Sequence, residues 1–163
     1  MLSRCCLTAL ILAAVAGIAS AADEPLPVTV HTRAVSLSPG GAAEAVATVT
    51  IQEGYRIQAN PTPGRYLLPT MLLFPAAEGI HAEGPVYPPG KPFHLEDDDF
   101  QFSGYQGKIE IRVPIKASSA VKPGDYTLNG HLRYQLSTSD SFLRKATLPV
   151  TLQVHVTAPA TRR

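Results

Sequence analysis

A cluster of hydroxyl side chains with one carboxylate is the first stretch whose residue types could do chemistry. Ser137, Ser139 and Ser141 flank Asp140, and His131 stands a few residues before them. Serine, histidine and a carboxylate are the residue types of a hydrolase site. A nucleophilic serine of that kind needs a sharp strand–turn–helix elbow and a positioned base, whereas these serines occupy a polar turn. We therefore expect no catalytic residues here and no enzymatic activity.

A second candidate combines one imidazole with several carboxylates. His94 is followed by Glu96 and by Asp97, Asp98 and Asp99. Such groups can bind a divalent metal. The spacing is poor, because a loop for a hard cation places oxygens at alternate positions around a glycine. A solvated acidic loop is the simpler interpretation. We keep His94, Glu96 and Asp98 as weak metal candidates, with divalent-metal binding as the alternative function, and expect no cofactor.

The start of the chain reads as a targeting segment. Arg4 supplies a positive charge, residues 5–18 are an apolar run, and Ala19-Ser20-Ala21 is a small-x-small cleavage signal. This pattern predicts a signal peptide over residues 1–21, cleaved near Ala21/Ala22, and a periplasmic or secreted protein. Cys5 and Cys6 are the only cysteines in the sequence, and both fall inside this leader. The mature chain would then hold no disulfide and would depend on packing alone.

Charge and hydropathy limit the kinds of partner. Lys and Arg number 14 and Asp and Glu number 13, so removing Arg4 with the leader leaves the two in balance. No basic stripe is interleaved with aromatic residues, which argues against nucleic-acid binding. No second apolar run of membrane-spanning length follows the leader, and we expect no membrane span in the mature chain.

The longest regular pattern is an alternation of apolar and polar residues on both sides of the serine turn. Period-two alternation in β-branched and aromatic residues is typical of half-buried strands. Short polar side chains between two such runs favour a turn, so residues 126–156 should form an antiparallel hairpin. The predicted inward residues are Tyr126, Leu128, Leu132, Tyr134 and Leu136 in the first arm, and Leu148, Val150, Leu152, Val154 and Val156 in the second.

The other patterned stretches are also short and strand-like. The chain contains 15 prolines and 12 glycines, which punctuate many short elements and argue against long helices. We predict an all-β, immunoglobulin-like β-sandwich of about eight short antiparallel strands. It would occupy residues 22–156, with a long charged loop over 93–102 and a disordered tail over 157–163. The predicted strands are 28–33, 43–52, 55–59, 66–74, 80–87, 108–116, 126–136 and 147–156.

An ordered series of motifs resembles the periplasmic N-terminal domain of the membrane thiol–disulfide reductase DsbD. The main run is Pro-Gly-Asp-Tyr-Thr-Leu-Asn-Gly-His-Leu-Arg-Tyr-Gln at 123–135. Gly-Tyr-Arg-Ile-Gln-Ala-Asn at 54–60, Leu-Pro-Thr at 68–70, Val-Tyr-Pro-Pro-Gly-Lys at 86–91 and Tyr-Gln-Gly-Lys-Ile-Glu-Ile at 105–111 match in order. The resemblance implies an immunoglobulin-like sandwich whose hairpin tip docks thioredoxin-fold partners.

The departure from the family pattern concerns its redox cysteines. Ser137 stands where the family has its first cysteine, and Phe142, or Leu143 in the longer spacing, stands where it has the second. Neither serine nor phenylalanine can form a disulfide or a reactive thiolate. Thiol–disulfide oxidoreductase activity is therefore not expected.

The resemblance and the missing cysteines together predict a non-catalytic protein-binding module. Its partners would be periplasmic thioredoxin-fold proteins or other envelope proteins. The family's cysteine pair can be covered by a loop with flanking aromatic residues, and Phe93, Phe100 and Phe102 would be remnants of that cover. The predicted partner surface comprises Tyr134, Gln135, Ser137, Phe142 and Leu143 from the hairpin, with Phe100 and Phe102.

Overall fold

The computed structural model describes residues 27–63, 66–95 and 98–158, with the backbone alone described for 98–100. The predicted signal peptide and most of the predicted tail lie outside these ranges. The described residues form eleven strands and no helix, three strands more than the sequence predicts, and they include no helix able to cross a membrane. The strands are β1 (Val28–Thr32), β2 (Val35–Leu37), β3 (Ala42–Ile51), β4 (Arg56–Gln58), β5 (Met71–Leu73), β6 (Ile80–Ala82), β7 (Lys91–Leu95), β8 (Asp98–Tyr105), β9 (Lys108–Ala117), β10 (Gly124–Ser137) and β11 (Phe142–Val156).

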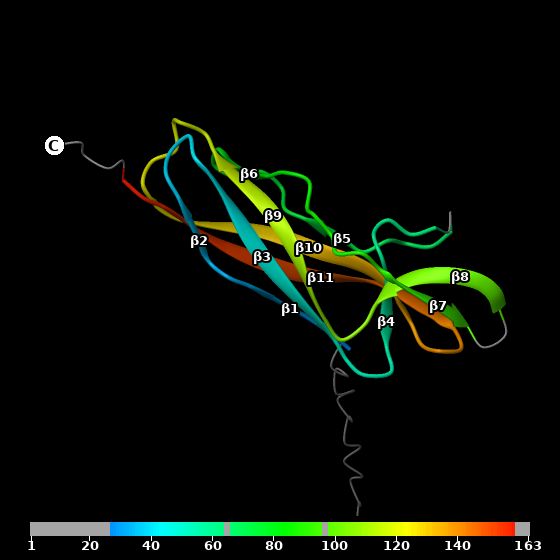
Figure 1. Cartoon of the computed structure of the whole chain (residues 1–163). Coiled ribbons are helices and arrows are strands. Elements are labelled where there is room, and N and C mark those ends of the chain that lie inside the picture. The colour runs from blue at the N-terminus through cyan, green and yellow to red at the C-terminus, as the bar shows by residue number, and fades with distance from the viewer. Residues whose placement is uncertain (1–26, 64–65, 96–97, 159–163) are drawn as a thin grey trace, which may run out of the picture.

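The strands form two packed sheets, which confirms the all-β sandwich. One sheet has the order β1-β3-β9-β6, and the other has the order β2-β11-β10-β4-β8-β7, with β5 paired to β10. The long strands β10 and β11 run through most of the molecule, and β7 and β8 lie beside the turn between them at one end (Figure 1). The expectation of a purely antiparallel sandwich is wrong at one place, because β2 pairs with β11 in parallel.

The core lies between the sheets and follows the predicted alternation. Ala45, Ala47 and Val49 of β3 are buried, as are Ile111 and Val113 of β9. Their polar neighbours face solvent, so each strand buries one face, as period-two patterning requires. Truncating a large core side chain in such a layer typically costs about 2–5 kcal/mol of stability.

The hairpin of β10 and β11 forms as predicted, with one correction at its tip. Its register runs from Gly124↔Val156 to Gln135↔Lys145, then shifts and resumes at Ser137↔Phe142. Ser137 belongs to the strand and is fully buried, so the turn is shorter than the sequence indicates. The Thr138 amide donates to the Ser141 carbonyl oxygen at 3.0 Å and closes that turn.

The predicted charged loop over residues 93–102 is wrong. Residues 93–95 and 98–102 belong to strands β7 and β8, which pair antiparallel with Phe93 and Phe102 as register partners. Phe93 and Phe102 are buried on these strands. Acidic residues are rare in strands, which is why the pattern reads as a loop. The predicted strand over residues 66–74 is also corrected, because Met71–Leu73 alone is strand.

Gly130 is a point where two strands approach too closely for any side chain. An added Cβ would lie 2.3 Å from the Leu73 carbonyl oxygen and 2.4 Å from a ring carbon of Phe74. We expect Gly130→Ala to lower the free energy of unfolding by about 1–3 kcal/mol, because β5 must move off β10. Chemical denaturation measures this loss. Gly84→Ala is the matched control, because no atom lies within 4 Å of its Cβ position; an equal loss in both variants would contradict the close approach.

Candidate partner-binding site at the hairpin tip

The two positions that the resemblance aligns with the family's cysteines lie opposite each other in the hairpin. Ser137 and Phe142 are Cα partners in the β10–β11 register, and directly opposed residues project their side chains to the same face. This pairing selects Phe142 over Leu143 as the counterpart of Ser137. The Ser137 hydroxyl is buried and lies 3.5 Å from the Arg56 carbonyl oxygen, to which it donates. No nucleophile is exposed at this pair.

An aromatic row from the neighbouring hairpin packs against the tip. Phe102 of β8 contacts Phe142 edge-on, with ring centroids 4.7 Å apart and an interplanar angle of 83°. Phe102 also contacts Phe93 of β7 at 5.6 Å. Edge-to-face pairs of this kind contribute about 0.5–1.5 kcal/mol beyond their burial. The structure thus brings predicted residue Phe102 onto Phe142. The side chain of Phe100 lies outside the described residues.

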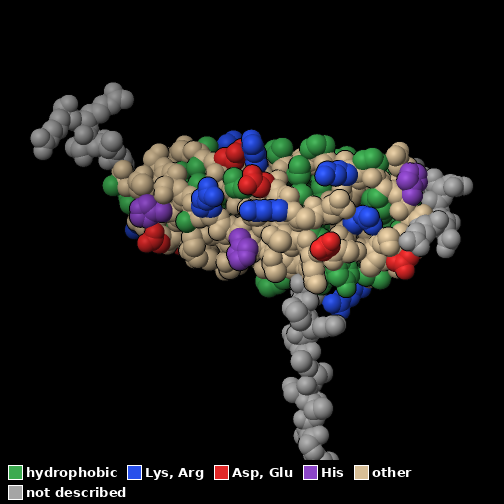
Figure 2. All heavy atoms as spheres, turned by 60° about the horizontal axis from the view of Figure 1, so that its bottom comes forward, with side chains coloured by type: hydrophobic (Ala, Val, Ile, Leu, Met, Phe, Trp, Pro, Cys, Tyr) green, Lys and Arg blue, Asp and Glu red, His purple; other side chains and the backbone are tan. Residues whose placement is uncertain are grey.

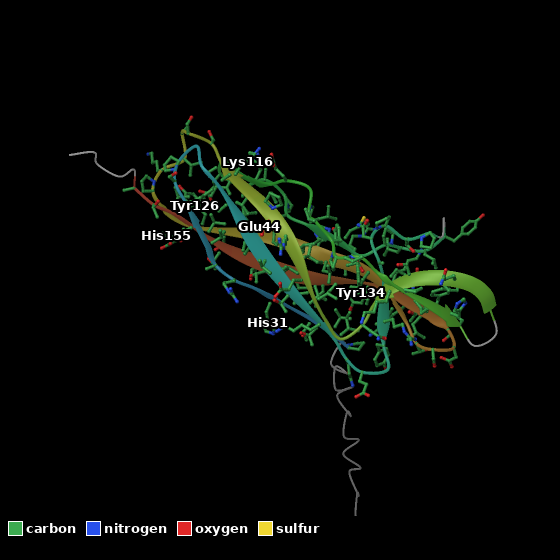
Figure 3. The ribbon with its side chains drawn as sticks, in the orientation of Figure 1. His31, Glu44, Lys116, Tyr126, Tyr134 and His155 are labelled. Atoms are coloured by element: carbon green, nitrogen blue, oxygen red, sulfur yellow. The ribbon has the colours of Figure 1, made fainter. Side chains whose placement is uncertain are left out.

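Tyr134 and Gln135 are placed differently from the prediction of a partner surface. Tyr134 is 1% exposed and Gln135 is 8% exposed, so neither side chain is open to a partner. The Gln135 side-chain oxygen accepts a hydrogen bond from the Leu68 amide at 3.0 Å, which fastens the loop before β5 to β10. Figure 3 shows Tyr134 near β4, far along the sandwich from Tyr126 and His155. The buried side chains of Tyr134 and Gln135 therefore support the tip from within the fold.

The Tyr134 hydroxyl is a buried polar group without a hydrogen-bond partner in the described part of the chain. Burial raises the pKa of this hydroxyl, and the positive charge of Arg144 partly opposes that shift. A buried hydroxyl that lacks a partner carries a desolvation cost. The ring, not the hydroxyl, is what stabilises the fold at this position.

The accessible part of the predicted surface is small. Leu143 is 37% exposed and Phe142 is half-buried. The turn before them exposes Ser139 and Asp140. The Thr138 hydroxyl donates to the Asp140 carboxylate and lowers the pKa of that carboxyl. A partner at this end of the molecule would meet Phe142, Leu143 and the turn, and it would not meet Tyr134, Gln135 or Ser137.

The described residues do not form a metal site around the predicted ligands. His94 is exposed on β7. Glu96 and the side chain of Asp98 lie outside the description. Among the side chains that the structure does describe, no three of His, Cys, Asp and Glu gather in a metal-binding group. Metal binding by His94, Glu96 and Asp98 therefore stays a prediction.

Sequence reasoning missed a polar network that holds β4 behind the tip. The Tyr105 hydroxyl accepts from the Asn60 amide at 3.0 Å and donates to the Pro88 carbonyl oxygen at 2.9 Å. The Asn60 side chain donates to the Thr70 carbonyl oxygen at 2.9 Å, and the Thr70 hydroxyl donates to the Gln58 carbonyl oxygen at 2.6 Å. These residues come from four of the matched motifs. The ordered motifs that contain these residues were the available sequence signal for the network. The role of these residues is structural.

The buried tyrosines make the fold sensitive to alkali. Burial raises the pKa of Tyr87, Tyr105 and Tyr134. A raised folded-state pKa gives stability that is fully present below the ordinary tyrosine value of about 10 and is lost as the pH rises through the folded value. We therefore expect the free energy of unfolding to fall above about pH 10. Urea denaturation from pH 8 to 11 measures it.

One variant and one control sharpen the alkaline experiment. Tyr134→Phe should flatten the decline, because it removes one buried group that must ionise. Tyr66 is exposed, so Tyr66→Phe should leave the decline unchanged. Stability that stays constant from pH 8 to 11 would contradict the burial of these hydroxyls.

Charges over the surface are mixed. Figure 2 shows Lys and Arg side chains interspersed with Asp and Glu on the face in view, without a single-sign field. This pattern agrees with the nearly balanced composition. A broad electrostatic surface for a polyanion is not present on this face.

Comparisons with known proteins show the fold and no more. No family model matches the sequence, and no curated protein sequence matches it. The N-terminal periplasmic domain of ScsB from Proteus mirabilis has 16% identity and a TM-score of 0.55, over 82% of this chain and 49% of that chain. This chain thus spans about half the length of that structure.

Two further structures are similar at lower scores. The DsbD N-terminal domain of Neisseria meningitidis, in the reduced form, has 12% identity and a TM-score of 0.42, over 68% of this chain and 77% of that chain. A type I cohesin from Pseudobacteroides cellulosolvens has 11% identity and a TM-score of 0.49, over 83% and 97%. At 16% identity the likeness to the ScsB domain shows the fold alone, and an activity must be argued from the site.

Proposed function

We propose that this protein is a non-catalytic protein-binding module that contacts its partner through the tip of the β10–β11 hairpin. The observation that carries the proposal is the pairing of Ser137 with Phe142, whose ring packs edge-on against Phe102. By the resemblance, these two positions correspond to the family's thiol pair, and Phe102 packs against one of them, Phe142. Half-buried Phe142 can contribute to contact, and neither side chain can transfer electrons.

The non-catalytic part follows from the chemistry of the two positions. A hydroxyl and a phenyl ring supply neither a thiolate nor a disulfide, and residues 22–163 contain no cysteine. We expect no activity in an insulin-reduction assay. Turnover by protein that lacks the leader would contradict this part of the proposal.

The proposed location is the periplasm. The predicted signal peptide supports export, and the domain from Proteus mirabilis with the shared fold is described as periplasmic. The proposed partners are thioredoxin-fold proteins or other proteins of the envelope. An exposed leucine beside a half-buried phenylalanine is a small apolar contact point, suited to a specific and transient partner.

The accessible residues of the tip provide the test. Leu143→Asp places a charge in the proposed contact and should abolish recovery of crosslinked partners from the native envelope, because a desolvated charge opposes binding. Lys122→Asp, at the opposite end of β10, is the control for an added acidic side chain and should leave recovery unchanged. Equal recovery with both variants would contradict the proposed surface.

A further inference from the structure

A cleft opens beside the hairpin tip, where three separate turns meet. Its volume is about 590 Å³, and its lining comes from the β3–β4 turn, the β8–β9 turn and Ser139 of the hairpin turn. Arg56 and Lys91 line this cleft and also line an adjoining hollow of about 160 Å³. The two cations therefore stand at the boundary between the two spaces.

The Arg56 guanidinium is held in place from two sides. Its Nη1 donates to the Thr138 carbonyl oxygen at 3.3 Å, and its central carbon lies 5.3 Å from the centroid of the Phe93 ring. The backbone of Arg56 is fixed as well, because Arg56 is the register partner of Ser137. A guanidinium has five N–H donors in a rigid fork, so these contacts leave donors available while they restrict its orientation.

Neither cation has a carboxylate partner within the described residues. The ion pairs there involve Arg112, Lys116 and His155, and none involves Arg56 or Lys91. Glu53 is the one carboxylate that lines the larger cleft, and the smaller hollow has none. The remaining polar lining is neutral and includes Gln106. The larger cleft thus has two cations in its lining against one carboxylate, and neither cation is in an ion pair within the described residues.

We infer that this cleft binds a side-chain carboxylate of an acidic peptide segment. A positioned arginine fork matches a carboxylate through two parallel hydrogen bonds, and a nearby lysine adds a point charge. A single carboxylate would fill a small part of a cleft of this volume, which lies in the range of spaces that hold larger organic ligands. Half-buried Tyr55 lines the same cleft and offers an apolar surface to the rest of the segment.

The inference deepens the proposed function and rests on it, because the cleft shares the hairpin turn with the proposed contact surface. A partner seated on Phe142 and Leu143 would extend past Ser139 into the cleft. Acidic residues next to the apolar contact of that partner would then give it orientation, since charge complementarity fixes register and approach.

The test is a titration of purified protein, expressed with its own leader, with a blocked peptide of three glutamates between glycines, followed by backbone amide NMR. We expect shifts at Gln106, Gly107 and Ser139, and we expect them to weaken with added salt. The same peptide with glutamine in place of glutamate should give none. Lys91→Gln should weaken binding about tenfold, the usual scale for one lost charge-assisted hydrogen bond. Lys122→Gln is the charge-matched control and should bind as the original protein does.

Four outcomes would contradict the inference or its geometry. Equal shifts with the glutamine peptide would show that charge is not recognised, and equal binding by Lys91→Gln and Lys122→Gln would show that the cleft is not the place. Equal shifts with inorganic phosphate at the same concentration would show a small-anion site and not a peptide site. Arg56→Lys keeps the positive charge but lacks the paired N–H donors of a guanidinium. Unchanged binding would therefore contradict bidentate recognition of the carboxylate by Arg56. None of these measurements requires the natural partner, so failure here is distinguishable from failure of the Leu143 experiment.

Discussion

Protein carrying Ser137→Cys and Phe142→Cys is expected to form an intramolecular disulfide across the hairpin under mild oxidation. Cα atoms of directly opposed residues in an antiparallel pair lie about 4.5–5.5 Å apart, and a disulfide needs about 4.4–6.8 Å. Ser137 and Phe142 are such a pair. The measurement is titration of free thiols and intact mass on protein that lacks the leader and its two cysteines.

The control for this experiment moves one thiol along the strand. Lys145 lies opposite Gln135, so Ser137→Cys with Lys145→Cys places the thiols beyond disulfide reach and should leave both free. Two free thiols in the first variant after oxidation would contradict the register at the tip. Disulfide formation in both variants would mean that the tip is too mobile to hold a fixed pair.

The second large effect is expected at Tyr134, where two substitutions should have opposite consequences. Tyr134→Ala empties a fully buried site and should cost about 3–5 kcal/mol of stability. Tyr134→Phe removes a buried hydroxyl that has no hydrogen-bond partner among the described residues, and it should leave stability unchanged or raise it. Urea denaturation at neutral pH measures both. A loss above about 1 kcal/mol in Tyr134→Phe would show that the hydroxyl is satisfied.

The Tyr134→Phe variant also tests whether Tyr134 supports the fold or contacts the partner. Because Tyr134 is 1% exposed, Tyr134→Phe should leave partner recovery unchanged even though the residue lies next to the tip. Reduced recovery with a stable Tyr134→Phe protein would mean that the partner opens the tip and reaches the hydroxyl.

The strands that could be predicted are those whose alternation is long enough to read. β3, β9, β10 and β11 each have 10 residues or more, and every predicted inward residue of β10 and β11 is buried or half-buried. β2 could not be found, because it has three residues and depends on pairing with Val154–Val156 of β11. Short strands carry no periodicity of their own, and tertiary pairing decides them.

The candidate site likewise has parts that could be predicted from the sequence and parts that could not. The family resemblance assigned Ser137 and Phe142 to the two cysteine positions. The register of the hairpin shows that they are direct cross-strand partners. Alternation places Gln135 on an outward face, yet it is buried, because Leu68 and the loop around it cover that face. The cleft of Arg56 and Lys91 is assembled from turns far apart in the chain, so no local pattern could indicate it.

The most direct test of the central claim is site-specific photo-crosslinking in the native envelope. A photoreactive residue at Leu143 should give a discrete crosslinked partner, and one at Ser119, which is exposed in the turn before β10 at the opposite end, should give none. Identification of the same partner with the Tyr134→Phe protein would support contact through the exposed tip. Crosslinks that are equally strong at Ser119, or absent at Leu143 while present at Ser119, would contradict a partner surface at the hairpin tip.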